Sequence, residues 1–598
     1  MTALLLLTLV SLVGLPGQPA AEPEAAAVRY RVDLSNRAQQ IVKIEADIPA
    51  VDGVAEVVLP VWRPGRYGVL DFAAHVREWS AADAAGRPLP TQKVRKDVWR
   101  IEADGDDDTV TFAYEIYAND LGTRTRHVDD THAFLSGSSI FVLSPPHRDE
   151  LHLVSLDLPD GWKIASGLDQ EGSDLFADSY DVLMDSPIEA GHFASHRFDA
   201  HGVDTEVAIW GDVDPDWQAI ERDFSAIADV QLQVFGGDVH FDRYVYIIHA
   251  YPGGRGGTEH LNSTVCQTTP ATFQDESRYH GFLGLIAHEY FHTWNVKRFR
   301  PAGLVPYGFN EENYTSMLWL VEGTTSYYDD LTLVRAGITP RDEYFDRIGS
   351  STTSVEDRPG ARRSSLSDSS FDAWLKFWGP SSPDHRNTSV NFYTHGAMVS
   401  LCLDLLLRDS TDGERSLDDV MRELADRFDW TEGNGYTPSD VRAIVSDIAG
   451  RDMGWFFDRH IDGTEPPPIR AALAHAGVLI ERTTADDELL FGASTTREGV
   501  GLRVTRLAEG SPAFAAGINV DDVLTSIDGW SLADRSISDA LGYFELGDEV
   551  AVSLARRGRQ RDIIVTLDTP QPGGFEVREV DEPSERQLRI RDGWLGGS

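Results

Sequence analysis

Two histidines and a glutamate near the middle of the chain have the spacing of a metal-dependent hydrolytic site. They form an H-E-x-x-H pattern, His288 to His292, inside the apolar stretch 281–297. This stretch contains no proline and predicts a buried helix, on which residues four apart share a face. Both imidazoles would therefore point at one metal ion. Glu289 would lie beside the metal, where a carboxylate can take a proton from water. A chance match is the alternative.

Glu322 is the predicted third metal ligand. It follows the apolar residues 317–321 in a second long stretch with a helical pattern, 313–335. A carboxylate among Leu, Trp and Val is costly unless it is paired or bound to a metal. A solvent-facing Glu is the alternative, but its neighbours leave little polar side for it. Because a catalytic zinc site takes three protein ligands and leaves one position open, we expect one Zn²⁺ per chain on His288, His292 and Glu322.

Five segments carry a family resemblance. They are LPVWRPGRY from Leu59, GGTEHLNST from Gly256, HEYFHTWNVKRFRP from His288, LVEGTTSYY from Leu320 and YTHGA from Tyr393. In this order they closely resemble the glycyl aminopeptidase family of the gluzincin zinc metallopeptidases, over nearly the whole mature chain. The resemblance implies a zinc-dependent aminopeptidase that removes small first residues, Gly or Ala, from peptides with a free N-terminus.

The same resemblance implies roles for further residues. Glu259 would hold the α-amino group of the substrate, because a cationic amine needs an anionic partner. Tyr393 would donate its phenol to the oxyanion that forms at the peptide carbonyl. Gly257, in a glycine-rich loop that lets backbone approach a ligand, and His260 would line the substrate site, or His260 would only support Glu259. The alternatives are a satisfied loop carboxylate at 259 and a core aromatic at 393. His395 stands where the family usually has lysine, so no role is transferred to it.

The chain is expected to form several domains, because 598 residues are too many for a single hydrophobic core. Short alternating runs in 28–200 predict an N-terminal β-sandwich. Residues 204–464 mix strand and helix patterns, and the resemblance implies a thermolysin-like zinc peptidase domain that passes from α/β to helical. Three prolines, 466–468, predict a stiff linker. Residues 469–568 resemble an α+β PDZ domain, through GSPAFAAGI and DDVLTSIDG, and 570–598 are predicted to be a polar tail.

Residues 1–21 predict a secretory signal peptide. Their apolar run, Leu4–Leu15, is too short to cross a bilayer comfortably, and small residues follow it. An uncleaved anchor is the alternative. No later stretch is predicted to span a membrane, so we expect a secreted or periplasmic protein with no stable membrane span after cleavage.

The net charge of −44 comes from acids spread along the chain. It argues against nucleic acid as a partner, since binding phosphates needs a basic face. A saline habitat and a well-solvated surface are both consistent with it. The two cysteines, Cys266 and Cys402, are predicted to be buried thiols, with a single disulfide as the alternative in an exported protein.

Two other functions are consistent with these residues. The first is an endopeptidase on the same zinc site, to which the PDZ-like domain presents substrates; Glu259 argues against it. The second is a non-catalytic PDZ adaptor on a peptidase scaffold; the zinc ligands and Glu289 argue against it. PDZ domains add a peptide to a sheet edge and hold its terminal carboxylate, and Leu490–Ala493 is the candidate carboxylate loop. A domain that only packs on the catalytic unit is the alternative.

Overall fold

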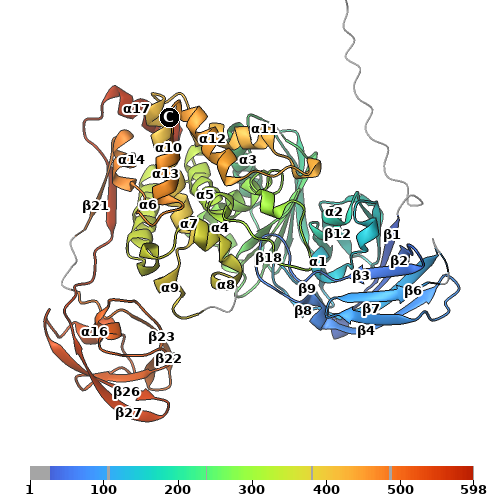
Figure 1. Cartoon of the computed structure of the whole chain (residues 1–598), viewed down its shortest axis with the longest axis horizontal. Coiled ribbons are helices and arrows are strands. Elements are labelled where there is room, and N and C mark those ends of the chain that lie inside the picture. Colours follow the sequence, from blue (N-terminus) through green and yellow to red (C-terminus); the bar gives the residue numbers. More distant parts are fainter. Residues whose placement is uncertain are drawn as a thin grey trace, which may run out of the picture.

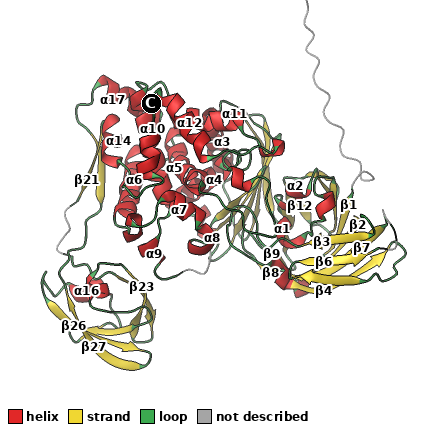
Figure 2. Ribbon diagram, in the orientation of Figure 1, coloured by secondary structure: helices red, strands yellow, loops and turns green. Residues whose placement is uncertain are grey.

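The computed structural model describes residues 27–103, 105, 108–237, 239–378, 382–483 and 488–596. The predicted signal peptide, 1–21, lies outside the described residues. The chain forms an N-terminal β-rich domain, a central domain in which helices pack on a sheet, and a small C-terminal β-rich domain (Figure 1, Figure 2). The multidomain prediction, with a β-rich N-terminal part followed by a helical part, is confirmed.

The N-terminal domain is built from strands that alternate apolar and polar residues. Along β7 (Thr109–Tyr117) every second side chain is buried, so one sheet face packs on the core. The hydroxyls of Tyr30 and Tyr114 donate across this core to the carbonyls of Val142 and Ile140. The larger sheet has the order β13-β14-β11-β1-β2-β7-β4 and the smaller one β3-β6-β5. The other bounds are β1 Val28–Asp33, β2 Ile41–Pro49, β3 Val54–Val58, β4 Val76–Asp83, β5 Thr91–Arg95, β6 Val98–Glu102, β11 His152–Asp157, β13 Asp169–Glu171 and β14 Asp174–Ala177.

Two five-stranded sheets join the N-terminal domain to the central domain. Their orders are β12-β15-β10-β9-β8 and β16-β17-β18-β20-β19. Apolar side chains of both sheets, such as Phe134 and Ile247, form one buried cluster, so the two domains share a core. In the second sheet the short strand β19 lies at the edge and carries Glu259. The bounds are β8 Asn119–Asp120, β9 Arg126–Val128, β10 His132–Leu135, β12 Lys163–Ser166, β15 Ile188–Gly191, β16 Ala194–Ala200, β17 Val203–Trp210, β18 Arg243–Ala250, β19 Gly257–Glu259 and β20 Ser263–Thr268.

The helix predicted for 281–297 is α4 (Glu276–Phe291), so the helix starts earlier and ends sooner than its apolar pattern predicts. It starts early because the Asp275 side chain caps its first turn. It ends at Phe291 because Asn295 turns back: its carbonyl lies 2.6 Å from Nδ1 of His292, and its side chain amide donates to the carbonyl of Leu320.

The stretch 313–335 forms a π-helical turn, Trp319–Gly323, that leads into α5 (Thr324–Arg335). Its first residues are not helical, so this predicted helix also begins later than its pattern. Single π turns inside helices are rare and are frequent at functional sites. Here the π turn carries Glu322.

Helix α10 (Phe392–Ser410) is the apolar centre of the central domain. The helical stretch His385–Ser410 is long and apolar enough to cross a membrane, but 78% of its apolar window is buried inside the protein. Packing within the domain therefore accounts for its composition. Cys402 on α10 and Cys266 on β20 are both buried and free. The remaining α-helices of this part are α1 Gly137–Ile140, α2 Tyr180–Met184, α3 Trp217–Val234, α6 Arg341–Glu356, α7 Leu366–Phe371, α8 Ala373–Lys376, α9 His385–Thr388, α11 Leu417–Arg427, α12 Pro438–Ala449 and α13 Gly454–His460.

The C-terminal β-rich domain is inserted between two paired strands, β21 (Val478–Arg482) and β28 (Phe575–Glu579). The predicted unit 469–568 therefore divides: its first residues form α14 (Ile469–His475), which packs on α10 of the central domain, and β21. The inserted domain contains the sheet β22-β23-β24-β26-β27. Its bounds are β22 Ala493–Glu498, β23 Gly501–Leu507, α15 Pro512–Ala515, β24 Val523–Ile527, β25 Trp530–Ser531, α16 Ile537–Leu541, β26 Glu549–Arg556 and β27 Arg559–Thr566.

The prediction of a separate polar tail at 570–598 is wrong. After β28, helix α17 (Glu585–Leu595) packs on the central domain. Its Trp594 is fully buried and its ring lies next to those of Tyr344 and Phe345. The segment is polar overall, but Ile590 and Trp594 are four residues apart and both are buried. The helix therefore has one apolar face, which the overall composition does not indicate.

Candidate active site

Three side chains from two segments face a common point in the central domain. Nε2 of His292 lies 3.1 Å from Nε2 of His288 and 3.2 Å from Oε2 of Glu322. The distance from Nε2 of His288 to the same carboxylate oxygen is 3.7 Å. His292 and Glu322 are buried, and the side chain of His288 is 13% exposed at the floor of a cleft. The structure thus brings together the three predicted metal ligands.

The far nitrogens of both imidazoles are held by hydrogen-bond acceptors. Nδ1 of His288 lies 3.1 Å from Oδ2 of Asp329, and Nδ1 of His292 lies 2.6 Å from the carbonyl of Asn295. An acceptor at Nδ1 keeps the proton there and leaves the Nε2 lone pair free to bind a metal. Two imidazoles and one carboxylate are the donor set of many catalytic zinc sites. These residues therefore fit a zinc ion.

Glu289 lies against strand β19. A Cβ added to Gly257 would come 2.2 Å from Oε1 of Glu289, so only glycine lets the strand pass this close. Burial raises the pKa of Glu289 to about 7. A carboxylate with such a pKa can both accept and return a proton near neutral pH. This is the position that the H-E-x-x-H spacing predicted for a base.

Glu259 reaches the same point from β19. Carboxylate oxygens of Glu259 and Glu289 and a ring nitrogen of His292 lie within 4.8 Å of one another. Gly65 of the N-terminal domain covers Glu259: its φ is +86°, and a Cβ there would come 2.5 Å from Oε1 of the carboxylate. The N-terminal domain therefore closes the site on the side of Glu259.

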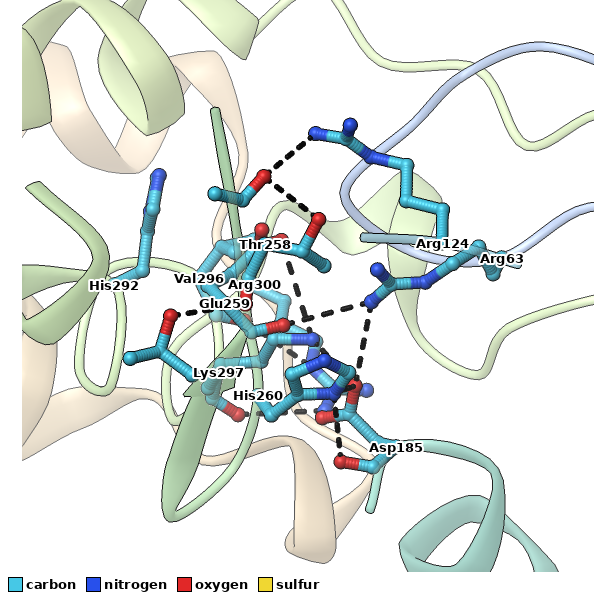
Figure 3. Close-up of polar contacts among 12 residues, drawn as sticks. Arg63, Arg124, Asp185, Thr258, Glu259, His260, His292, Val296, Lys297 and Arg300 are labelled. Carbon is cyan, nitrogen blue, oxygen red and sulfur yellow. Dashed lines mark hydrogen bonds and ion pairs between the residues drawn. The ribbon is translucent and has the colours of Figure 1, made fainter. Parts of the chain in front are cut away.

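A buried network of charges surrounds Glu259 (Figure 3). Nζ of Lys297 lies 2.8 Å from Oδ1 of Asp185 and 4.0 Å from Oε1 of Glu259. A guanidinium nitrogen of Arg63 lies 3.8 Å from the same Asp185 oxygen. Burial opposes ionisation of Glu259, but Lys297, His292 and Arg63 outweigh it and hold the pKa of Glu259 below its ordinary value. Glu259 is thus an anion at neutral pH.

His260 belongs to this network. Its Nδ1 lies 2.9 Å from the carbonyl of Asp185 and 3.2 Å from its carboxylate. Its side chain is 2% exposed, and it is not among the residues that line the cleft. Of the two roles predicted for His260, its placement matches support of the charges around Glu259.

Two arginines of the N-terminal region cover the outer edge of β19. The carbonyl of Gly256 accepts from β20, so Gly257 and Glu259 turn their carbonyls to the free edge. Arg124 donates to the carbonyl of Gly257 at 3.0 Å, and Arg63 approaches that of Glu259 at 3.5 Å. Figure 3 shows both guanidinium groups entering the site from the same side. They occupy the acceptors that an extended peptide would use along this edge.

Tyr393 stands in the first turn of α10, after the N-cap Asn391. Its ring stacks beside that of His288, with centroids 6.2 Å apart. It opens on a cleft of about 520 Å³. The cleft-lining residues come from both domains: Arg124, Gly257, Gly281, Gly284, Leu285, His288, Glu289, Ser326, Asp329, Asp330, Arg347, Ser351, Tyr393, Thr394 and Ala397.

The sequence reading missed several polar residues of the site. Asp329 had a usable signal, since it follows Glu322 by seven residues and so shares a helical face. Arg63 and Lys297 stand inside segments that carried the resemblance, but nothing there indicated their function. Asp185 and Arg124 come from loops far away in the sequence, and no local pattern marks them.

Two models of protein families match parts of the chain. Residues 281–399, which include the three predicted metal ligands and Tyr393, match the model of the M61 glycyl aminopeptidase. The chain is a metallopeptidase. Residues 29–192 of the metallopeptidase match the model of the peptidase M61 N-terminal domain. Both models describe domains of M61 peptidases, and the second match supports a general aminopeptidase activity. No curated protein matches the chain.

The metallopeptidase also resembles solved structures. An aminopeptidase N family protein from Idiomarina loihiensis is 27% identical, with a TM-score of 0.88 over 95% of this chain and all of that one. An M1 zinc metallopeptidase from Deinococcus radiodurans is 12% identical, with a TM-score of 0.45 over 74% of this chain and 94% of that one. The first likeness extends over the three domains.

Proposed function

We propose that the metallopeptidase is a zinc aminopeptidase that removes a small first residue, Gly or Ala, from peptides with a free N-terminus. The observation that supports it best is the position of Glu259, an anion that lies beside Glu289 and His292. An α-ammonium group held there places the first peptide bond at the metal ligands. The match to the glycyl aminopeptidase model supports the preference for a small residue.

The side chains divide the reaction among them. One zinc ion on His288, His292 and Glu322 would polarise the peptide carbonyl and lower the pKa of water. Glu289 takes the proton of the attacking water and gives it to the leaving nitrogen. Tyr393 donates its O–H to the carbonyl oxygen as this gains negative charge. Glu259 binds the ammonium group by charge-assisted hydrogen bonds and so fixes the scissile bond.

The covered edge of β19 argues against the endopeptidase alternative. An endopeptidase cleaves a peptide at an internal bond, so the residues before that bond would extend past Glu259. Gly65 and Arg63 lie against the strand at that point and block the path. No observation favours the adaptor alternative. It also does not explain why the two imidazoles face a common point beside Glu289.

Cleavage of matched peptides tests the proposal. A peptide that begins with Gly is offered free and N-acetylated, with and without a zinc chelator, and the products are weighed by mass spectrometry. We expect chelator-sensitive loss of single residues from the free form only. Glu259→Gln should abolish the discrimination against the acetylated peptide or greatly raise KM for the free one. Internal cuts in both forms would instead make the protein an endopeptidase.

We also propose that residues 488–570 are a PDZ domain that binds peptide C-termini. Among the described residues β22 pairs with β23 alone, which leaves a sheet edge for an added strand. The turn before it contains Gly492, with φ +82°, in the candidate carboxylate loop Leu490–Ala493. Titration of peptides with free and amidated C-termini checks this, and equal affinity for the two forms would refute it.

We further propose that the protein is exported, to the periplasm or outside the cell. The proposal depends on the apolar run of residues 1–21. N-terminal sequencing of the protein recovered from its native host checks it: cleavage after the small residues near position 21 is expected, and an intact N-terminus would indicate an anchor.

A further inference from the structure

Arg124 brings a positive charge into the active-site cleft, where it lies with His288, Glu289 and Tyr393. Its guanidinium donates to the hydroxyl of Thr123 at 3.2 Å and to the carbonyl of Gly257 at 3.0 Å. Its Nε is buried and has no hydrogen-bond partner in the part of the chain that the structure describes. A guanidinium has five N–H donors, so donors remain for a ligand.

No described carboxylate forms an ion pair with Arg124, although the chain has a net charge of −44. Three other cations near the cleft are paired. Lys297 and Arg63 share Asp185, and Arg347, which also lines the cleft, pairs with Asp330 and Glu343. Unpaired guanidinium groups in a cleft are sites for anions, because a carboxylate there gains charge-assisted hydrogen bonds.

A second arginine adds to this charge. Burial and the nearby Arg124 lower the pKa of Arg66, so the two guanidinium groups repel each other. Arg66 also forms no ion pair with a described carboxylate. The N-terminal region therefore brings excess positive charge to the part of the cleft around Arg124.

Glu259 and Arg124 are spaced for a short substrate. Glu259 and Gly257, the residue that Arg124 contacts, are two positions apart on β19, which is about 7 Å along a strand. Glu289 lies against Gly257 and close to the carboxylate of Glu259. A substrate whose ammonium group lies at Glu259 and whose first peptide bond lies at Glu289 would place its second residue beside Arg124.

We propose that Arg124 binds a carboxylate of the second substrate residue, on the leaving-group side of the scissile bond. The inference rests on the proposed aminopeptidase function and narrows its substrates. The carboxylate has two sources, the C-terminus of a dipeptide or the side chain of an acidic second residue. Both present the same planar anion to the guanidinium.

Four substrates separate these sources: Gly-Leu, Gly-Leu-amide, Gly-Asp-amide and Gly-Asn-amide. In the wild-type protein a free carboxylate should lower KM by roughly 10- to 100-fold relative to the matched neutral substrate, as for hydrogen bonds to a charged group. A preference for Gly-Leu over its amide assigns Arg124 to the C-terminus. A preference for Gly-Asp-amide over Gly-Asn-amide assigns it to an acidic side chain.

Variants then assign the preference to this residue. Arg124→Gln should abolish the preference, so that KM for the carboxylate substrate becomes about equal to KM for its matched neutral substrate, while any change in kcat is shared by both substrates. Arg124→Lys should keep part of the preference, because it retains charge but loses the planar fork. Arg100→Gln removes the same charge from an exposed strand position, so it should behave as wild type. Zinc content and melting temperature establish that each variant is folded.

Glycine p-nitroanilide carries no carboxylate. It therefore tests the proposed aminopeptidase function without testing the role of Arg124. If the wild type cleaves glycine p-nitroanilide and has equal KM values for the carboxylate peptides and their neutral counterparts, the role of Arg124 is refuted. The proposed aminopeptidase function would still stand. If the wild type cleaves neither glycine p-nitroanilide nor any of the four peptides, the proposed function itself fails. If Arg124→Gln does not fold, the wild-type substrate comparison together with Arg124→Lys still decides.

Discussion

Gly323 and Gly396 touch. A Cβ on Gly323 would lie 2.5 Å from the Cα of Gly396, and a Cβ on Gly396 would lie 2.9 Å from the Cα of Gly323. The first glycine directly follows Glu322 in the π turn, and the second stands one helical turn after Tyr393. The close approach of these two segments therefore helps to set the distance between Glu322, a predicted metal ligand, and the phenol of Tyr393.

Gly323→Ala should reduce both activity and stability. The added methyl group forces backbone apart at a contact where neither side can yield, which costs about 1–3 kcal/mol. A shift of about 1 Å between Glu322 and Tyr393 should lower kcat/KM by roughly 100-fold. Steady-state kinetics and urea unfolding measure the two effects. Gly542→Ala is the control, since its nearest neighbour would be 3.7 Å away in the C-terminal domain; unchanged kinetics in Gly323→Ala would contradict the argument.

Glu289→Gln should remove catalysis but keep the metal. The amide fills the same space beside Gly257, but it cannot accept and return a proton, so kcat should fall by roughly 10²–10⁴-fold. The metal ligands are unchanged, and zinc content should equal that of the wild type. Single-turnover kinetics with metal analysis checks both parts. Retained kcat would mean that another group moves the proton.

Asp329→Asn should weaken metal binding without removing a ligand. Asp329 holds Nδ1 of His288 at 3.1 Å, and loss of such an orienting carboxylate typically costs 10- to 100-fold in metal affinity. Competition with a zinc chelator of known affinity measures the effect. Asp330→Asn is the matched neighbour: it pairs with Arg347 instead, and its zinc affinity should stay that of the wild type. Equal affinities of the two variants would refute the role of Asp329.

Stability should fall between pH 6.5 and pH 4 because of buried His152. Burial lowers its pKa to about 4 in the folded protein, below the value of about 6.5 in an unfolded chain. Between these values the unfolded chain binds more protons, so acid favours unfolding. At pH 5 this amounts to about 2 kcal/mol. His152→Phe should flatten the loss between pH 7 and pH 5 in urea unfolding, whereas the same change at exposed His192 should not.

Each of the three candidate metal ligands follows from a local pattern in the sequence, and their side chains come together in the fold. The four-residue spacing of His288 and His292 on a helix indicated them as metal ligands. Glu322 was indicated because it is an acidic residue within an apolar helical stretch. The supporting charges could not be predicted in this way. Asp185 reaches Lys297 across 112 positions, and this contact exists only because the N-terminal domain packs on the central sheet. Sequence patterns also misplaced helix ends, since Asp275 and Asn295 set them through side-chain hydrogen bonds rather than through apolar periodicity.

The chain leaves the central domain along β21 and returns along β28, and the two crossing points adjoin: Thr483 donates its N–H to the carbonyl of Gly574 at 2.9 Å. In the topology of the central domain, the inserted domain therefore takes the place of the turn that connects β21 and β28. A short turn between the same two strands would close the fold equally well. The peptidase can thus acquire, exchange or lose a domain at this position while α17 and its buried Trp594 stay in place, so the last helix belongs to the catalytic unit although it follows the insert in the sequence.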